Sequence, residues 1–228
     1  MEIFLDTADI KEIKRWLDMG LCDGVTTNPS IMVRNEVYDF EKGAKEIASL
    51  IHPRPLSVEV TTNDLDEMVR QARHLASLAP NIVIKIPQLN EYGEPCYGVI
   101  KRLEEDGIRV NATVAMSFGQ VICAAKAGAT YISIFAGRIG DEGGDAAEVI
   151  RNSVNWLCLW NYKSKIIVGS MRSVADIQSA ILAGAHIITI PPDIMRRLVD
   201  HKYTRSTVAQ FIADARKAYE MAEKLKGS

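Results

Sequence analysis

The chain has 228 residues, of which 47% are hydrophobic and 25% charged, and its formal net charge is −2 at pH 7. This composition is typical of a globular protein with a sizeable core, and it excludes disordered and collagen-like chains. Because the net charge is close to zero, no global basic field exists to hold nucleic acid or anionic lipid. No apolar run reaches the length of a membrane span, so we expect neither a nucleic-acid nor a membrane partner.

Eight short β-branched runs alternate along the chain with longer amphipathic stretches. A strand followed by a helix, repeated eight times, requires a parallel sheet. Eight such units suit a closed (β/α)8 barrel, or TIM barrel, better than an open doubly wound sheet, and neither GxGxxG nor GxxxxGK[ST] is present. The predicted strands cover residues 3–6, 24–27, 56–60, 82–86, 108–113, 130–135, 166–170 and 186–190.

The predicted fold is therefore an α/β single (β/α)8 barrel with an additional C-terminal helix. No Pro/Gly/Ser-rich linker divides the chain, so we predict one domain over residues 1–228. Apolar residues recur every three or four positions within 204–226, which predicts an amphipathic helix with one buried face. That face packs either on the barrel or on a neighbouring subunit.

Short local patterns predict where helices begin and end. Four glycines each follow a helical pattern and precede a strand, as helix-stopping residues with positive φ do. Asp64 with Glu67 predicts a capping box at a helix start. The segment 141–145 is predicted to be a mobile surface loop. The four glycines are Gly20, Gly107, Gly128 and Gly184.

The cysteines and histidines bear on the compartment and on metal binding. The four cysteines form no CxxC pair, and no secretory leader precedes the first apolar segment, so we expect free thiols in a cytoplasmic protein. The four histidines form no HExxH motif or Cys/His cluster, which gives little support for a metal site. We expect His74 to be a plain surface residue.

Strand parity predicts which side chains face the barrel interior. In the strand at 56–60, Leu56, Val58 and Val60 share one parity, which leaves Ser57 and Glu59 to point inward. The same rule brings polar side chains together at the carboxyl ends of the strands, where barrel enzymes place their chemistry. The inward-facing set includes Phe4, Asp6, Val83, Lys85, Asn111, Thr113, Tyr131, Ser133 and Phe135.

Lys85 is the strongest candidate for a reactive group. A lysine inside the apolar strand at 82–86 loses its solvation, which favours the neutral amine, and a neutral amine is a nucleophile. The alternative is a structural ion pair with Asp6 or Glu59, but buried ion pairs are poor stabilisers. We therefore predict a Schiff-base lysine, with Asp6 or Glu59 moving protons.

A second candidate site follows the sixth and seventh strands. Ser170 and Arg172 lie at the seventh strand–helix turn, where backbone N–H groups favour an anion, and Arg138 follows the sixth strand. Two arginines and a hydroxyl fit a phosphate. A lone arginine is usually an ordinary surface residue, but the position after the sixth and seventh strands of a barrel favours an anion site here. Asn28 is either part of the site or an Asn-Pro turn at a helix start.

Ordered motifs along nearly the whole chain resemble the transaldolase family in its short form. They are Phe-Leu-Asp-Thr-Ala at 4–8, Gly-Val-Thr-Thr-Asn-Pro-Ser at 24–30, Val-Ile-Lys-Ile-Pro at 83–87, Asn-Ala-Thr at 111–113, Ala-Ala-Lys-Ala-Gly-Ala at 124–129 and Ser-Ile-Phe-Ala-Gly-Arg at 133–138. Two features depart from the family pattern: Ile134 stands where Pro is frequent, and residues 115–119 replace a more usual run. Both neighbour the candidate site, so they bear on the substrate more than on the chemistry.

The resemblance implies a role for each matched polar residue. Lys85 would form the imine with a ketose phosphate, Asp6 would take and return the proton of the C4 hydroxyl, and Glu59 with Thr113 would hold a proton-shuttling water. Asn28, Asn111 and Ser133 would bind the dihydroxyacetone hydroxyls, and Arg138, Ser170 and Arg172 the phosphate. No metal or organic cofactor is needed. The implied substrate-binding set is Thr27, Asn28, Asn111, Ser133, Phe135, Arg138, Ser170 and Arg172.

The implied activity is transfer of a dihydroxyacetone unit from fructose 6-phosphate or sedoheptulose 7-phosphate to an aldose phosphate, as in the pentose phosphate pathway. A fructose 6-phosphate aldolase is a second hypothesis, but that relative resembles a variant with Gln at the Glu59 position and Tyr at the Phe135 position. A transaldolase for sulfonated fructose is a third, and a barrel that binds sugar phosphates without turnover is a fourth. Since short relatives form rings, a homo-oligomer is expected.

Overall fold

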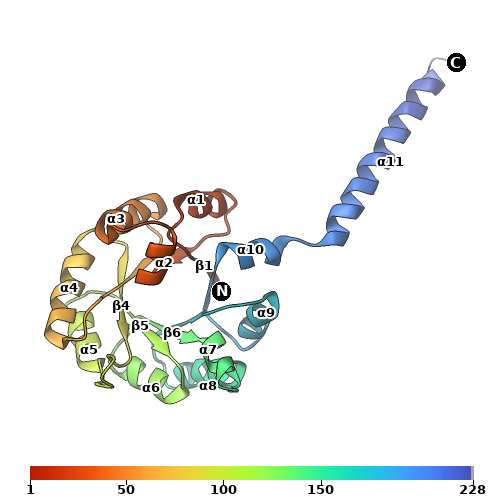
Figure 1. Cartoon of the computed structure of the whole chain (residues 1–228). Helices are drawn as coiled ribbons and strands as arrows, with labels where there is room; N and C mark the ends of the chain where they lie inside the picture. Colours follow the sequence, from red (N-terminus) through yellow and green to blue (C-terminus); the bar gives the residue numbers. More distant parts are fainter. Residues whose placement is uncertain (227–228) are drawn as a thin grey trace. The chain divides into compact units, whose positions relative to one another are not determined.

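The computed structural model describes residues 1–226, which divide into a barrel unit, Met1–Ile194, and a second unit that starts at Met195. The barrel unit contains eight parallel strands that close in chain order, β1 to β8, with helices α1 to α9 around them (Figure 1). This confirms the predicted (β/α)8 barrel. The strands are β1 (Glu2–Asp6), β2 (Gly24–Thr26), β3 (Leu56–Glu59), β4 (Ile82–Pro87), β5 (Val110–Ala115), β6 (Tyr131–Phe135), β7 (Lys165–Gly169) and β8 (Ile187–Ile190).

Each strand is followed by at least one helix, as parallel pairing requires. The helix after β2 is doubled, and two helices also follow β6. The helices of the chain are α1 (Ile10–Asp18), α2 (Pro29–Arg34), α3 (Phe40–Ile51), α4 (Leu65–Ser77), α5 (Tyr97–Glu105), α6 (Phe118–Lys126), α7 (Ala136–Asp141), α8 (Ala146–Leu159), α9 (Val174–Leu182), α10 (Pro192–Val199) and α11 (Lys202–Lys226). Among residues 1–226, no helix is both long and apolar enough to cross a membrane.

The barrel interior is filled by apolar side chains of the parity that the sequence predicts. Phe4, Val83, Tyr131, Ile167 and Ile187 form one buried cluster, and the rings of Phe4 and Tyr131 meet edge to face with centroids 6.4 Å apart. A Cβ at residue 24 would lie 2.7 Å from the Phe4 ring, so only glycine fits there. The packed interior leaves the carboxyl ends of the strands as the place for a site.

Most predicted helix ends agree with the structure, with one correction. Gly20, Gly107, Gly128 and Gly184 all have positive φ, between 71° and 96°, as predicted. The Asp64 carboxylate accepts from the Glu67 backbone N–H at 2.6 Å. The Glu67 carboxylate, however, binds Arg70, so the predicted capping box is wrong in its second half.

Strand β5 differs most from its prediction. It begins at Val110 and ends at Ala115, two residues later at each end than the predicted strand. Its pairing with β6 shifts register between Ala112 and Ala115, and Val114 has a φ of 60°. A β-branched residue rarely adopts this conformation, so the backbone next to Thr113 is strained.

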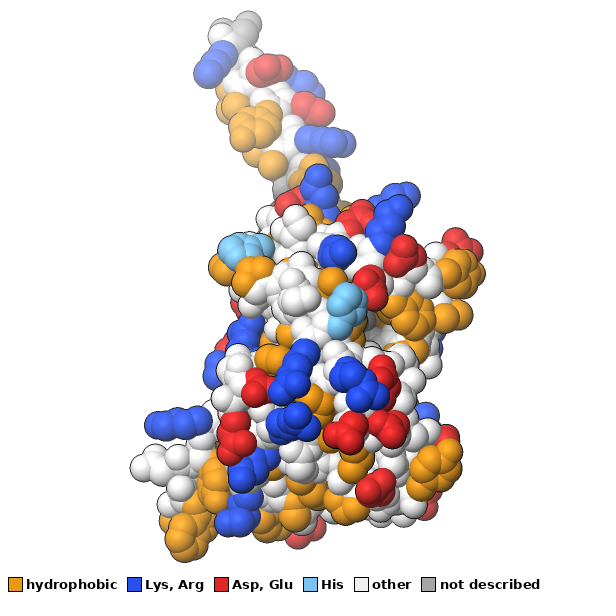
Figure 2. Space-filling model, turned by 90° about the vertical axis from the view of Figure 1, so that its left-hand side faces the viewer, with side chains coloured by type: hydrophobic (Ala, Val, Ile, Leu, Met, Phe, Trp, Pro, Cys, Tyr) orange, Lys and Arg blue, Asp and Glu red, His pale blue; other side chains and the backbone are white. Residues whose placement is uncertain are grey.

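The second unit contains the predicted C-terminal helix, which begins two residues earlier than expected, at Lys202. Its apolar residues follow one face, as the spacing predicts. Which surface covers that face stays a prediction, as does the single domain over 1–228. On the side of the barrel unit that α3 and α4 cover, charged side chains of both signs are interspersed (Figure 2).

Candidate active site

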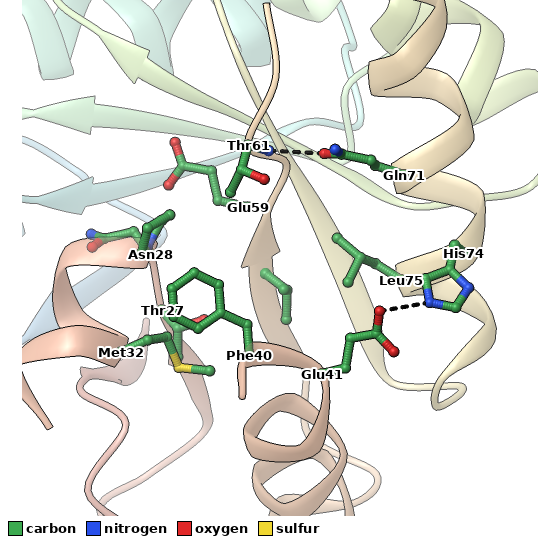
Figure 3. Close-up of a pocket in the computed structure, with 12 residues that line it drawn as sticks. Thr27, Asn28, Met32, Phe40, Glu41, Glu59, Thr61, Gln71, His74 and Leu75 are labelled. Carbon is green, nitrogen blue, oxygen red and sulfur yellow. Dashed lines mark hydrogen bonds and ion pairs between the residues drawn. The ribbon is translucent and has the colours of Figure 1, made fainter. Parts of the chain in front are cut away.

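A cavity of about 410 Å³ opens at the carboxyl ends of the barrel strands, and we call it the barrel cavity. It contains nine of the twelve predicted site residues. The other three, Thr27, Glu59 and Asn111, lie next to it, and Thr27 and Glu59 line a second cavity on the side of the barrel (Figure 3). The nine residues are Asp6, Asn28, Lys85, Thr113, Ser133, Phe135, Arg138, Ser170 and Arg172.

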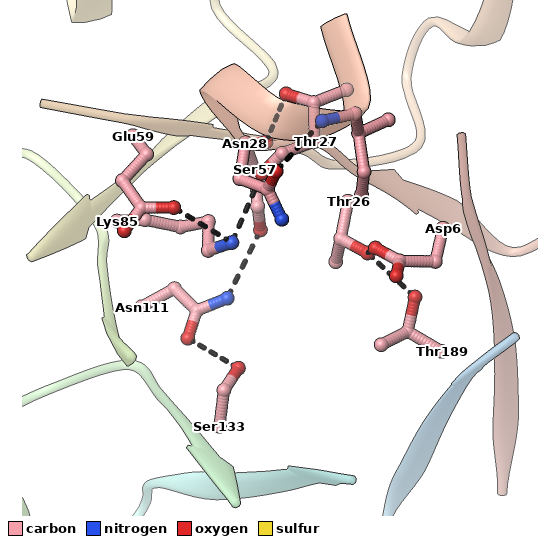
Figure 4. Close-up of polar contacts among 11 residues, drawn as sticks. Asp6, Thr26, Thr27, Asn28, Ser57, Glu59, Lys85, Asn111, Ser133 and Thr189 are labelled. Atoms are coloured by element: carbon pink, nitrogen blue, oxygen red, sulfur yellow. Dashed lines mark hydrogen bonds and ion pairs between the residues drawn. The ribbon is translucent and has the colours of Figure 1, made fainter. Parts of the chain in front are cut away.

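Lys85 is held at the boundary of the barrel cavity by two oxygen atoms. It projects from β4, where it lies opposite Glu59 of β3 in the strand register, and it is only 4% exposed. Its Nζ donates to the Thr27 carbonyl at 2.9 Å and lies 3.2 Å from Glu59 Oε2 (Figure 4). A carboxylate at this distance is within reach to take a proton from the amine, which a nucleophilic lysine requires.

Asp6 faces Lys85 from the opposite part of the barrel, at the end of β1. The Thr26 hydroxyl donates to Asp6 Oδ1 at 2.7 Å and lies 2.6 Å from the Thr189 hydroxyl (Figure 4). Since Thr26 has one proton and gives it to Asp6, Thr189 must donate to Thr26. Burial raises the pKa of Asp6 above its ordinary value, while Lys85, the Thr26 hydrogen bond and Arg34 act in the opposite direction. A carboxyl group with a raised pKa is suited to both taking and returning a proton.

The Asn111 amide is fixed in orientation by two serines. Ser133 donates to Asn111 Oδ1 at 2.7 Å, and Asn111 Nδ2 donates to Ser57 Oγ at 3.2 Å. Asn111 is fully buried behind Ser133, and Ser133 lines the barrel cavity. The predicted contact of Asn111 with substrate stays a prediction, whereas its support of Ser133 is a direct observation.

The Thr113 hydroxyl is buried and has no hydrogen-bond partner among the described residues. Thr113 lines the barrel cavity next to the strained Val114. Leaving a buried hydroxyl without a partner costs free energy, about 1–3 kcal/mol, unless a water or ligand satisfies it. This orphaned hydroxyl therefore supports the predicted role of Thr113 as a contact for a water molecule.

Asn28 serves the local fold as well as the cavity. Its Oδ1 accepts from the Ile31 backbone N–H at 2.9 Å, so Asn28 is the N-cap of α2. The helix therefore begins at Pro29, directly after its cap. The cap uses only the oxygen, and the residue also lines the barrel cavity.

The predicted anion site is occupied in part by the protein's own carboxylate. Both terminal nitrogens of Arg172 donate to the carboxylate of Asp141, at the end of α7. The hydrogen bond from Arg172 lowers the pKa of Asp141, which keeps this carboxyl ionised. An anionic ligand has to share Arg172 with Asp141, whereas Arg138 and Ser170 line the same part of the cavity.

Gly137 lets α7 approach the turn after β7. A Cβ at this position would clash with the Ser170 carbonyl and lie 2.8 Å from Ser170 Oγ and 2.9 Å from Arg172 Nε. We expect Gly137→Ala to displace both side chains and to raise KM about tenfold, a loss of ~1.4 kcal/mol in binding. Steady-state kinetics measure the effect.

Gly140→Ala in the same helix is the matched control, because nothing lies within 4 Å of a Cβ there. Its KM should match that of the unmodified protein. Equal KM values for the two variants would contradict the proposed packing of Gly137 against the anion site.

Several cavity residues are absent from the prediction, and two simple patterns would find them. Thr26 and Thr189 follow from strand parity. Thr26 lies two residues after Gly24, which faces the Phe4 ring, and Thr189 lies two residues after the buried Ile187. Ser30 and Arg34 both line the cavity from α2, and their i, i+4 spacing directly after a strand places them on one helix face. Arg34 is the third arginine that lines the cavity, and its charge acts on the Asp6 carboxyl group.

Among the described residues, no group of three or more His, Cys, Asp or Glu side chains is arranged to hold a metal ion. The four cysteines are free thiols, of which Cys22 and Cys96 are buried and Cys123 and Cys158 exposed. His74 is exposed, as expected, but its Nε2 also lies 2.9 Å from Glu41 Oε1.

Comparison with known proteins gives one consistent family. A sequence profile described as Transaldolase/Fructose-6-phosphate aldolase matches residues 3–227. A "Probable transaldolase" of Lactiplantibacillus plantarum is 41% identical over 224 residues, covering 98% of this chain and 100% of the relative. A "Probable transaldolase 2" of Listeria monocytogenes is 42% identical over 214 residues, with 94% and 95% coverage.

Solved structures share the fold at low identity. A thiamine phosphate pyrophosphorylase from Pyrococcus furiosus superposes with a TM-score of 0.59 at 13% identity, covering 86% of this chain and 93% of that chain. This likeness concerns the barrel alone.

Proposed function

Because the chain belongs to the transaldolase/fructose-6-phosphate aldolase family, we propose that it transfers a dihydroxyacetone unit from a ketose phosphate to an aldose phosphate through an imine on Lys85. One observation carries this proposal: the buried Lys85 amine lines an open cavity, with Glu59 at 3.2 Å. Asp6 and the cations Arg138 and Arg172 line the same cavity, so nucleophile, acid–base group and anion site surround one substrate volume.

Lys85, Glu59 and Asp6 account for the steps of this reaction. The Lys85 amine attacks the C2 carbonyl of the ketose, and Glu59 moves the protons that allow the C2 oxygen to leave as water. Asp6 then takes the proton of the C4 hydroxyl, the C3–C4 bond breaks, and the aldose phosphate product leaves. The electron pair of that bond remains on the dihydroxyacetone unit as an enamine. The acceptor aldehyde reacts with the enamine, Asp6 returns its proton, and water releases the new ketose from Lys85.

Phe135 and Glu59 favour transfer over discharge to water. Phe135 lines the barrel cavity and brings no hydroxyl to it. At positions 59 and 135 the sequence resembles the transaldolases and not the aldolase variant with Gln and Tyr. A transferase has to keep the enamine dry until an acceptor arrives, because early protonation and hydrolysis would release free dihydroxyacetone. The aldolase hypothesis therefore lacks a supporting observation in this cavity.

The decisive assay is incubation of the pure protein with fructose 6-phosphate, with and without erythrose 4-phosphate, and identification of the products by mass. Sedoheptulose 7-phosphate formed only with the acceptor is the expected result. Free dihydroxyacetone accumulating without acceptor would identify an aldolase. No product in either reaction would contradict the proposal, and the same assay with a sulfonated fructose would then test that substrate.

The anion site gives a separate prediction. We expect Arg172→Gln to raise KM for both sugar phosphates by about ten- to a hundredfold, because a charge-assisted hydrogen bond is lost and Asp141 remains as an unpaired carboxylate facing the anion. The double variant Arg172→Gln/Asp141→Asn should recover part of that loss.

The exposed Arg151 on α8 supplies the control, and Arg151→Gln should leave KM unchanged. A double variant as weak as Arg172→Gln alone would show that Asp141 does not oppose the ligand. Unchanged KM in Arg172→Gln would remove this residue from the anion site.

We also propose that the protein acts on small sugar phosphates in the cytoplasm and that it forms a homo-oligomer. Four unpaired thiols fit a reducing compartment. The apolar face of α11 offers a contact between subunits, and sedimentation of the purified protein tests it.

A further inference from the structure

A second cavity, the side cavity, has a volume of about 230 Å³ and lies between α2, α3 and α4 on the outer side of β3 (Figure 3). At its inner end it reaches Thr27, Asn28 and Glu59. At its outer end it reaches His74 and Glu41, whose side chains are exposed to solvent and pair at 2.9 Å. The side cavity therefore extends from the protein surface to the carboxylate next to Lys85.

Glu59 and Lys85 lie between the two cavities, and Asn28 lines both of them. Glu59 lines the side cavity and its side chain is 19% exposed, whereas Lys85 lines the barrel cavity and its side chain is 5% exposed. The two charged groups are 3.2 Å apart. A water molecule that reaches Glu59 from the side cavity can therefore act on Lys85 without crossing the space that the sugar occupies.

The proposed imine chemistry needs such a path. Each imine formation releases one water, made from the C2 oxygen, and each hydrolysis consumes one. A bound sugar occupies the open end of the barrel cavity. Water has to be excluded from the enamine at this end, because the acceptor enters there. Water and protons thus have to be exchanged at Glu59 from another direction.

We propose that the side cavity is the route by which water and protons reach Glu59 while a sugar occupies the barrel cavity. This proposal rests on the imine mechanism proposed above. The occupant is water, because the cavity is small and the surface on this side of the barrel unit mixes charges of both signs (Figure 2). Phe40 and Leu75 supply an apolar wall, and the Asn28 and Thr61 side chains add polar contacts.

Leu75→Trp tests the route by filling the side cavity from α4. The measurement is the loss of ¹⁸O from the C2 carbonyl of labelled fructose 6-phosphate into water, divided by the rate of sedoheptulose 7-phosphate formation. If the labelled water released from C2 leaves through the side cavity, blocking this cavity keeps the water next to the iminium. It then adds back to C2, and less ¹⁸O reaches the solvent. We expect the ratio to fall about fivefold or more in Leu75→Trp.

Leu75→Ala should act in the opposite direction by widening the route. Water then reaches the iminium more often. After protonation of the enamine at C3, addition of water releases dihydroxyacetone and regenerates the Lys85 amine. We expect the ratio of free dihydroxyacetone to sedoheptulose 7-phosphate to rise about fivefold or more. Both ratios are measured in both variants, and each should fall in Leu75→Trp and rise in Leu75→Ala. A merely structural effect of residue 75 would not move the same ratio in opposite senses.

Arg70→Trp is the matched control on the same helix, since Arg70 is exposed and does not line the side cavity. Both ratios should stay at their original values. Reduction with borohydride separates the two proposals. A Lys85 adduct with unchanged ratios in both Leu75 variants would overturn the water route alone, and no adduct in the unmodified protein would overturn the imine mechanism.

Discussion

Lys85→Met removes the imine and lowers turnover by roughly 10⁴-fold or more, the range observed when a covalent nucleophile is lost. Methionine has a similar length and keeps the strand apolar, but it has no amine to attack a carbonyl. Borohydride reduction in the presence of fructose 6-phosphate, followed by mass spectrometry, should give an adduct on the unmodified protein and none on the variant.

The control has to account for Glu59, which loses its partner at 3.2 Å in this variant. Removing one member of a buried ion pair destabilises a protein, so the free energy of unfolding is measured alongside activity. Lys126→Met, at an exposed position at the end of α6, should retain both activity and adduct. Near-normal turnover of folded Lys85→Met would contradict the mechanism.

The barrel was predictable from the sequence because parallel strands have a simple period. Lys85 and Glu59 are adjacent in the register of β3 and β4, and Asn111 is the partner of Lys85 on β5. Alternation of side chains therefore identifies the inward-facing residues without tertiary information. The same alternation applied to β2 and β8 would also have found Thr26 and Thr189.

Other features of the site depend on contacts that no local pattern encodes. The pairing of Arg172 with Asp141 joins residues from two strand–helix units, and it changes how the anion site works. Val114 has a β-branched side chain, so local propensity predicts a regular strand there. The structure instead gives this residue a positive φ. The side cavity arises between helices α2, α3 and α4, and its connection to Glu59 requires their packing.

Asp6→Asn should separate imine formation on Lys85 from proton transfer at the C4 hydroxyl. Turnover should fall about 10²–10⁴-fold, the usual contribution of a general acid–base group, because asparagine cannot take the proton of the C4 hydroxyl. Lys85 keeps its hydrogen bond to Thr27 and its contact with Glu59, so the borohydride adduct should persist. Loss of the adduct together with turnover would mean that Asp6 is needed already for imine formation.

The same substitution should stabilise the folded protein at neutral pH. Burial raises the pKa of Asp6 above 3.8, so the folded state holds this proton more tightly than the unfolded state does. The contribution of Asp6 to the free energy of unfolding is therefore lost as the pH rises above 3.8 and through the raised pKa of the folded state. At pH 7 this contribution is absent. Asparagine keeps an oxygen for the Thr26 hydroxyl and carries no charge, so we expect the free energy of unfolding to rise by about 0.5–2 kcal/mol.

Urea denaturation at several pH values should show this gain at pH 7 and its disappearance in acid, where Asp6 is neutral in both states. A variant less stable than the unmodified protein at pH 7 would show that Lys85, Arg34 and Thr26 together outweigh the cost of burying the charge.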